Sequence, residues 1–188
     1  MGPRDVLLFA DATRLRLFPP LRAAWARGGE QAVVPVTGRN AGRVLFGARN
    51  VRTAHRVILR WPSETSPGAR AFLTEIRRHY RSAPTIGLLL DRGPAHTAAP
   101  TRRLAAELGI EFVWLPRQGP EWNARDQLWR EWKRLVAANR QAASIEDLAQ
   151  QAEAWVLGLR PQQVLRKAGI LSPCFWLKHL LQSLWRPT

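Results

Sequence analysis

Short apolar runs, each bounded by proline, glycine or charged residues, recur through the first part of the chain. A run of about four to eight apolar residues between turn signals is typical of a strand that is covered on both faces of a sheet. The pattern predicts strands at Val6–Ala10, Val44–Ala48, Val57–Trp61, Thr85–Leu90 and Glu111–Leu115, with a further short candidate at Val33–Val36.

Apolar residues at helical spacing separate and follow these runs. Phe72, Ile76 and Tyr80 give one apolar face to a helix over 69–80, which leads from the third of the five main runs to the fourth. A helix between two strands is the usual connection of parallel neighbours, so the sequence predicts a mixed α/β sheet. Further helices are predicted after Pro100, after the N-cap candidate Asn123, after Ser144 with its capping-box pattern, after Pro161 and after Ser172.

The segment that follows Ser172 is apolar on more than one side. A surface helix normally carries a single apolar stripe, so this segment either closes the core or contacts a second copy of the chain. A homodimer is therefore one expectation, and the sequence leaves both alternatives open.

Length and composition indicate one globular domain over residues 1–188. The chain has 188 residues, 46% of them hydrophobic and 23% charged, which is enough for one substantial core. No apolar stretch approaches the roughly 20 residues of a membrane helix. The N-terminus lacks the regions of a signal peptide and Cys174 is the single cysteine, so we expect a cytoplasmic protein without a membrane partner.

The charge balance predicts a polyanionic partner. There are 29 basic and 14 acidic residues, a net charge of +15, and 26 of the basic residues are Arg. The planar guanidinium matches phosphate geometry, which favours nucleic acid, although codon bias explains an excess of Arg over Lys equally well. Residues 39–60 hold six Arg and no acid; this region is either a DNA-facing surface or a solvated hairpin. The candidate DNA contacts are Arg49, Arg52, Arg56, Arg92, Arg117 and Arg125.

Three of the five Asp residues stand at predicted element ends. Asp11 follows the strand Val6–Ala10, Asp91 follows the fourth strand, and Asp126 lies near the start of the helix after Asn123. If the two strands are parallel neighbours, the helix can bring all three carboxylates together. Such acids repel one another unless cations neutralise them, and hard oxygen ligands suit Mg²⁺ or Mn²⁺, as two ions that serve phosphoryl transfer. Salt bridges to Arg, or helix capping by Asp126, are the simpler alternatives.

Several motifs surround these acids. They are Phe9-Ala-Asp11, Phe18-Pro-Pro-Leu-Arg-Ala-Ala-Trp25, Leu90-Asp91 with His96 shortly after, Trp114-Leu-Pro116, and Pro120-Glu-Trp-Asn-Ala-Arg-Asp126-Gln-Leu-Trp-Arg130 with Lys133; 34 residues separate the second and third acids. Together they resemble the DDE transposases, and more narrowly the catalytic domain of bacterial insertion-sequence transposases in the mariner-like superfamily. The resemblance covers nearly the whole chain.

The resemblance implies an RNase H-like fold, a mixed five-stranded sheet with helices on both faces and extra C-terminal helices. It also implies a DNA transposase that cuts and joins transposon ends with divalent metal, Asp11, Asp91 and Asp126 being the catalytic metal ligands. His96 and Asn123 match positions beside the site, where His96 is expected to brace a loop. Ala12 departs from the Glu of many relatives, and Ala124-Arg125 from their Pro-Ile; neither departure removes a ligand.

Relatives carry an upstream helix-turn-helix region, whereas this chain begins almost at the first catalytic strand. We therefore expect DNA and a separate helix-turn-helix subunit as partners, with nucleoid association when DNA is bound. One alternative is a degenerate or repurposed basic domain that binds DNA without cleaving it. Another is an RNase H-like nuclease that acts on RNA or hybrids.

Overall fold

Five strands form one sheet in the computed structural model, which describes residues 2, 4–116, 123 and 126–178. The strands are β1 (Val6–Arg16), β2 (Gly42–Asn50), β3 (Arg56–Trp61), β4 (Ile86–Leu90) and β5 (Ile110–Trp114). Their order across the sheet is β3-β2-β1-β4-β5. β1 pairs antiparallel with β2, and β2 with β3, whereas β4 is parallel to both β1 and β5. The predicted mixed sheet is thereby confirmed, with β1 at its centre.

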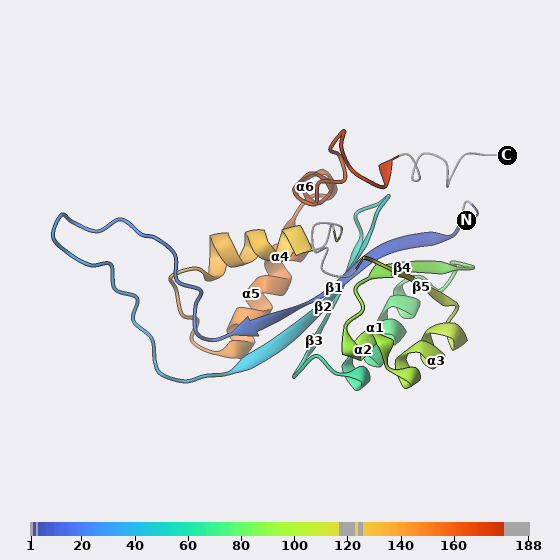
Figure 1. Cartoon of the computed structure of the whole chain (residues 1–188), viewed down its shortest axis with the longest axis horizontal. Coiled ribbons are helices and arrows are strands. Elements are labelled where there is room, and N and C mark those ends of the chain that lie inside the picture. Colours follow the sequence, from blue (N-terminus) through green and yellow to red (C-terminus); the bar gives the residue numbers. More distant parts are fainter. Residues whose placement is uncertain (1, 3, 117–122, 124–125, 179–188) are drawn as a thin grey trace.

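Helices cover both faces of this sheet (Figure 1). On one side lie α1 (Ser66–His79), α2 (Pro94–Thr97) and α3 (Ala99–Glu107). On the other lie α4 (Asp126–Trp132), which continues into the π-helical turn η2 (Lys133–Ala137), then α5 (Ile145–Gly158) and α6 (Pro161–Lys167). The Ser144 hydroxyl accepts a hydrogen bond from the Asp147 amide at 3.0 Å and so caps α5 as predicted.

The alternation of side chains along β1 divides the core into two layers. Leu8 and Ala10 pack among the residues that α1 covers. Leu7 and Phe9 face the opposite layer, as does Leu15 beneath α4 and α5. Because successive strand residues point to opposite faces, Asp11 belongs to the α4 and α5 side.

Several predicted boundaries were wrong. The first strand does not end at Ala10, because β2 is long enough to pair with β1 through Asp11 and on to Arg16. Residues 33–36 form no strand. His96 lies in the short helix α2 rather than in a loop. Residues 171–177 form turns instead of the start of a helix, and the rest of that predicted helix lies outside the described residues.

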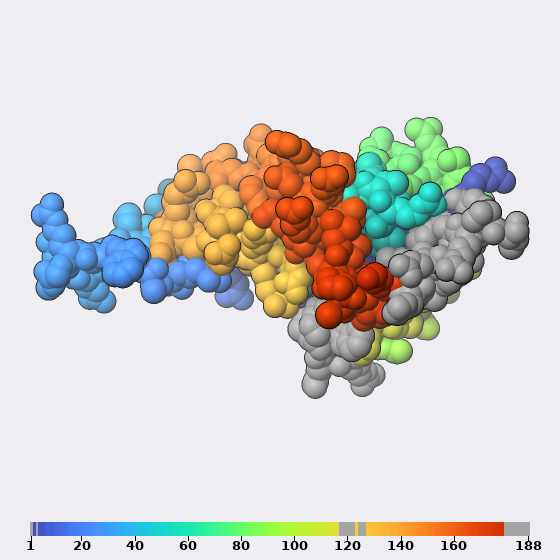
Figure 2. Space-filling view, turned by 90° about the horizontal axis from the view of Figure 1, so that it is seen from above, coloured from blue at the N-terminus to red at the C-terminus, as the bar shows by residue number. Residues whose placement is uncertain are grey.

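A long segment without regular structure joins β1 to β2 and projects from the body of the molecule (Figures 1 and 2). We call residues 18–41 the arm. Its side chains are largely exposed, and Trp25 has a relative exposure of 103%. Both ends are held: the Leu17 amide donates to the Ala41 carbonyl at 2.9 Å, and the Arg22 amide donates to Asn139 Oδ1 at 2.7 Å.

No helix in the described part of the chain is long and apolar enough to cross a membrane. The arm also carries no helix or strand. The residues of the candidate site are thus positioned by the sheet and by the helices packed on it.

Gly68 lies where α1 packs closely against the sheet. A Cβ at this position would lie 2.5 Å from Trp61 Cδ1 and 3.0 Å from Phe46 Cε2, so one of these rings must move. We expect Gly68→Ala to lower the free energy of unfolding by about 1–3 kcal/mol, measured by urea denaturation. In the control Gly158→Ala, nothing lies within 4 Å of the added Cβ, and stability should stay equal or rise by about 0.5–1 kcal/mol. Equal effects of the two changes would contradict this packing.

Candidate active site

The two central parallel strands lead to two of the predicted acids. Leu8 pairs with Leu88, and Phe9 pairs with Leu89. Asp11 and Asp91 each follow the last of these pairs by two residues on their own strand. β4 ends at Leu90, so Asp91 lies just past the carboxyl end of its strand, while Asp11 remains within β1. Carboxyl ends of parallel strands are the usual place for a binding site in an α/β sheet.

The Asp91 carboxylate is accessible and locally oriented. Its side chain has a relative exposure of 61%. The Gly93 amide donates a hydrogen bond to Asp91 Oδ1 at 3.2 Å. A Cβ on Gly93 would approach Asp91 Oδ1 to 3.2 Å and His96 Cδ2 to 3.4 Å, so the absence of a side chain lets this turn close tightly against the acid.

His96 is buried behind Asp91. It is only 4% exposed, and its ring meets the Phe46 ring edge-on at 6.3 Å between centroids. Its Nε2 lies 3.8 Å from Asp91 Oδ1. Burial lowers the pKa of His96 and outweighs the opposing pull of the Asp91 and Glu64 charges, so the ring is mainly neutral at pH 7. This position fits a residue that braces the α2 turn.

Asn123 ties the segment before α4 to the central strand. The side chain is 5% exposed, and its Nδ2 donates to the Ala10 carbonyl at 2.9 Å. The last pair in the β1–β4 register is Phe9 with Leu89, so Asn123 supplies a partner where β4 stops doing so. Residues 124 and 125 lie outside the described residues, so the N-cap role of Asn123 stays a prediction.

α4 therefore begins close in sequence to an anchor on β1. Trp129 and Trp132, each 1% exposed, hold the helix against the sheet. The Asp126 side chain lies outside the described residues, so its predicted approach to Asp11 and Asp91 stays a prediction. The side chains that the structure describes include no group of three His, Cys, Asp or Glu that could hold a metal.

The donor chemistry of this region suits a hard divalent cation. Asp11 and Asp91 supply carboxylate oxygens from neighbouring strands, and α4 starts with a third Asp. Oxygen ligands with room for water are what Mg²⁺ and Mn²⁺ prefer. The helix dipole favours an ionised carboxylate in the first turn of α4.

The six arginines predicted to contact DNA differ in their exposure and in their hydrogen-bond partners. Arg49 is fully buried, with its guanidinium 5.9 Å from the centre of the Phe9 ring, and it is not available at the surface. The Arg56 guanidinium donates to the carbonyls of Leu159 and Leu157, which makes it part of the packing between β3 and α5. Arg49 therefore leaves the DNA-contact set, whereas DNA contact by the half-buried Arg56 stays a prediction.

Arg52 and Arg92 are exposed. The Arg92 guanidinium lies 5.5 Å from the centre of the Trp114 ring, beside the turn that follows Asp91. Arg117 and Arg125 lie outside the described residues. The DNA contacts that keep structural support as candidates are thus Arg52 and Arg92.

Glu64 was not found by sequence reasoning. It stands between β3 and α1. Burial lowers the pKa of His96, and the charge of Glu64 partly opposes that lowering. Its Oε1 would be 3.6 Å from a Cβ on Gly93, and its Oε2 accepts from Arg14 Nε at 3.2 Å. No motif marks this residue, because only the packing of α1 beside α2 brings it near Asp91.

The Asn123 anchor makes a prediction about stability. Asn123→Ala leaves the buried Ala10 carbonyl without this donor, so we expect the free energy of unfolding to fall by about 1–3 kcal/mol in urea denaturation. Gln151→Ala removes an exposed amide from α5 and should stay within about 0.5 kcal/mol of the wild type. An Asn123→Ala protein as stable as this control would contradict the anchoring role.

The fold is that of mariner transposase catalytic domains. A pre-cleavage Mos1 transpososome structure superposes with a TM-score of 0.69 at 14% identity, over 96% of this chain and 56% of that chain. The Mos1 mariner transposase catalytic domain gives a TM-score of 0.64 at 14% identity, over 96% of this chain and 82% of that one. The predicted RNase H-like fold is thereby confirmed.

Sequence comparison gives the family. An insertion element IS630 39 kDa protein of Shigella sonnei is 25% identical over 143 residues, which are 76% of this chain and 42% of the relative. The chain thus spans about half the length of the relatives it matches. The profile of the DDE superfamily endonucleases matches residues 6–149, and the chain belongs to that family.

Proposed function

We propose that this chain is the catalytic domain of a DNA transposase, which cleaves DNA strands and transfers them at transposon ends with the help of divalent metal. The observation that carries the proposal is the parallel β1–β4 pairing, whose last pair, Phe9 with Leu89, lies two residues before each of Asp11 and Asp91. The family match supports the same chemistry. Two of the Mos1 structures that share the fold are complexes with Mn and with Mg.

In this proposal Asp11, Asp91 and Asp126 hold two Mg²⁺ or Mn²⁺ ions. When bound, such a pair would activate a water or a 3′-hydroxyl and stabilise the leaving oxygen of an in-line phosphoryl transfer. The protein's part is to fix the ligands. Pairing of β1 with β2 holds Asp11, the Gly93 amide orients Asp91, and Asn123 is tied to the Ala10 carbonyl.

Charge supports DNA as the substrate. The net charge of +15 favours association with a polyanion. Arg92 stands next to Asp91 and is positioned to meet a phosphate near the reacting strand. Because the chain spans about half the length of its relatives, recognition of transposon ends is assigned to a helix-turn-helix unit that acts with this domain.

The arm supports self-association as a further part of the proposal. Trp25 and Val33 are 103% and 82% exposed, and the arm stands away from the body (Figure 2). Exposed large apolar residues on a projecting segment are suited to burial against another protein surface. A second copy of the chain is the partner that we propose.

Metal-dependent cleavage tests the proposal. With the end-recognising partner supplied, the wild type should nick or join transposon-end DNA in Mg²⁺ or Mn²⁺ and lose that activity in EDTA. Asp91→Asn should reduce activity by at least about a thousandfold, because it removes a ligand charge from the reacting centre. Asp147→Asn changes the same charge in the first turn of α5 and should leave activity unchanged.

Activity of Asp91→Asn equal to wild type would refute the metal-site assignment. Salt-dependent DNA binding without cleavage, unaffected or improved in Asp11→Ala, would favour the non-catalytic DNA-binding domain. Preferential cleavage of RNA or of hybrids over duplex DNA would favour the RNase H-like nuclease.

A further inference from the structure

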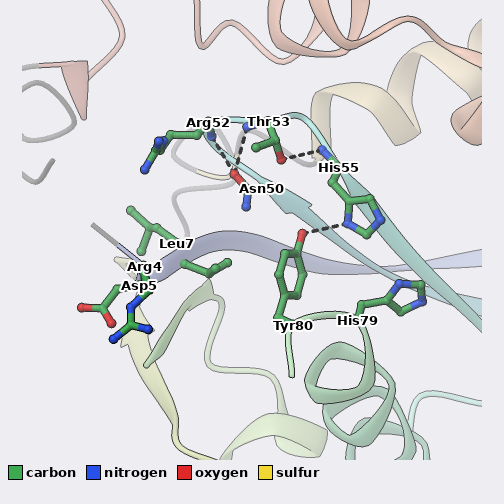
Figure 3. Close-up of a pocket in the computed structure, with 10 residues that line it drawn as sticks. Arg4, Asp5, Leu7, Asn50, Arg52, Thr53, His55, His79 and Tyr80 are labelled. Atoms are coloured by element: carbon green, nitrogen blue, oxygen red, sulfur yellow. Dashed lines mark hydrogen bonds between the residues drawn. The ribbon is translucent and has the colours of Figure 1, made fainter. Parts of the chain in front are cut away.

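A polar hollow lies beside the start of β1 (Figure 3). Its volume is about 430 Å³, and three elements form it: the start of β1, the turn between β2 and β3, and the end of α1. At about 3.3 Å per strand residue, Val6 is roughly 16 Å from Asp11 along β1. The hollow is thus separate from the candidate active site.

Cations and hydrogen-bond donors dominate the lining. Arg4, Arg52, His55 and His79 contribute to it, and Asp5 is its single acid. Both oxygens of Asp5 are engaged by backbone amides: Oδ1 accepts from Thr85 and Oδ2 from Gly2. The Asp5 carboxylate is therefore occupied by these backbone amides. The guanidinium of Arg4 forms no ion pair with any described residue.

A chain of hydrogen bonds orients His55. Asn50 Oδ1 accepts from the amides of Arg52 at 2.8 Å and Thr53 at 3.0 Å, which orders the turn that carries His55. Tyr80 Oη lies 2.8 Å from His55 Nδ1 (Figure 3). A protonated Tyr80 hydroxyl donates to Nδ1 of a neutral His55, which then carries its own proton on Nε2.

The ionisation states agree with this assignment. Burial raises the pKa of Tyr80 to about 12, so its hydroxyl keeps the proton at pH 7. Burial, and then the charges of His79 and Arg56, lower the pKa of His55, so its ring is mainly neutral and accepts at Nδ1. The result is a fixed neutral N–H donor among guanidinium groups, which is a suitable set for a phosphate oxygen.

The basic surface continues beyond the hollow. A second hollow of about 400 Å³, lined by Arg78, His79, Arg81 and Ser82, shares His79 with the first. The carbonyls at the end of α1 would repel an anion, but Arg77 Nη1 donates to the carbonyls of Tyr80 and Ala83 and so offsets them. Basic residues in the last turn also complement the helix dipole, but that role does not explain Arg4 and Arg52, which come from other elements.

We propose that the two joined hollows form a second binding site for the phosphate backbone of nucleic acid, remote from the carboxylates. Guanidinium groups on three separate elements can follow successive phosphates, which a single small anion would not require. The site rests on the proposed function for the identity of the polymer as DNA. It gives the domain a contact to duplex that does not enter the active site.

Salt-dependent binding tests the site. Binding of a labelled DNA duplex is measured by fluorescence anisotropy in EDTA over a range of salt concentrations. The double variant Arg4→Gln/Arg52→Gln should bind more weakly, and the slope of log K against log salt should become shallower by about 1.8, at about 0.9 for each lost phosphate contact. The matched control Arg102→Gln/Arg103→Gln removes the same charge from exposed positions of α3 and should keep the wild-type slope.

A wild-type slope in Arg4→Gln/Arg52→Gln, or an equal loss of slope in both double variants, would overturn the site. Tyr80→Phe changes no charge but removes the hydroxyl that orients His55, so a roughly fivefold weaker affinity is expected. Unchanged affinity in a Tyr80→Phe protein with a wild-type melting temperature would refute the donor role of His55.

Inorganic phosphate distinguishes a polymer site from a free-anion site. At constant ionic strength, millimolar phosphate should displace DNA no better than chloride does; effective displacement by phosphate would overturn the assignment to nucleic acid. Because the assay contains no divalent metal, its result is independent of cleavage. Failure of the proposed catalysis and failure of this site are therefore separable.

Discussion

The parallel pairing of β1 with β4 is the constraint on which the candidate site depends. A shift of the strand register by one residue turns every side chain of that strand to the other face of the sheet. Here Leu8 and Leu88 are buried in one layer, and Phe9 and Leu89 in the other. These apolar residues therefore lock the register, and each of the two acids follows it by two residues on its own strand. The core thus fixes the two strands from which both acids extend.

That arrangement is also why a cation suits the site. Carboxylates at one level of neighbouring strands destabilise the folded state through repulsion unless opposite charge or hydrogen bonds compensate. The Gly93 amide offers such a bond to Asp91, and the fully buried guanidinium of Arg49 lies over Phe9, two residues before Asp11. Positive charge is thus built into the same face of the sheet as Asp11.

Sequence patterns predicted the strands well because each is a short apolar run. They also indicated Asp91, because a charged residue directly after the apolar residues Leu88–Leu90 marks the end of a buried strand. They failed where tertiary pairing decides. The first strand was predicted to end at Ala10, yet β2 pairs with β1 as far as Arg16. Arg49 was predicted to contact DNA at the surface because arginine is usually exposed. No pattern in the neighbouring sequence indicates that it is buried. Glu64 and the pocket around His55 are assembled from distant segments, so spacing along the chain carries no sign of them.

The arm begins and ends on adjacent strands, since Leu17 and Ala41 are hydrogen-bonded to each other. Its closure is therefore already made by the sheet, whatever lies between. The entropy of closing a loop rises only by about 0.6 kcal/mol for each doubling of its length. Residues between these two points can consequently be lengthened, shortened or rewritten with little effect on the folded core. The arm is a part of the molecule in which binding properties can diverge while the catalytic framework stays the same.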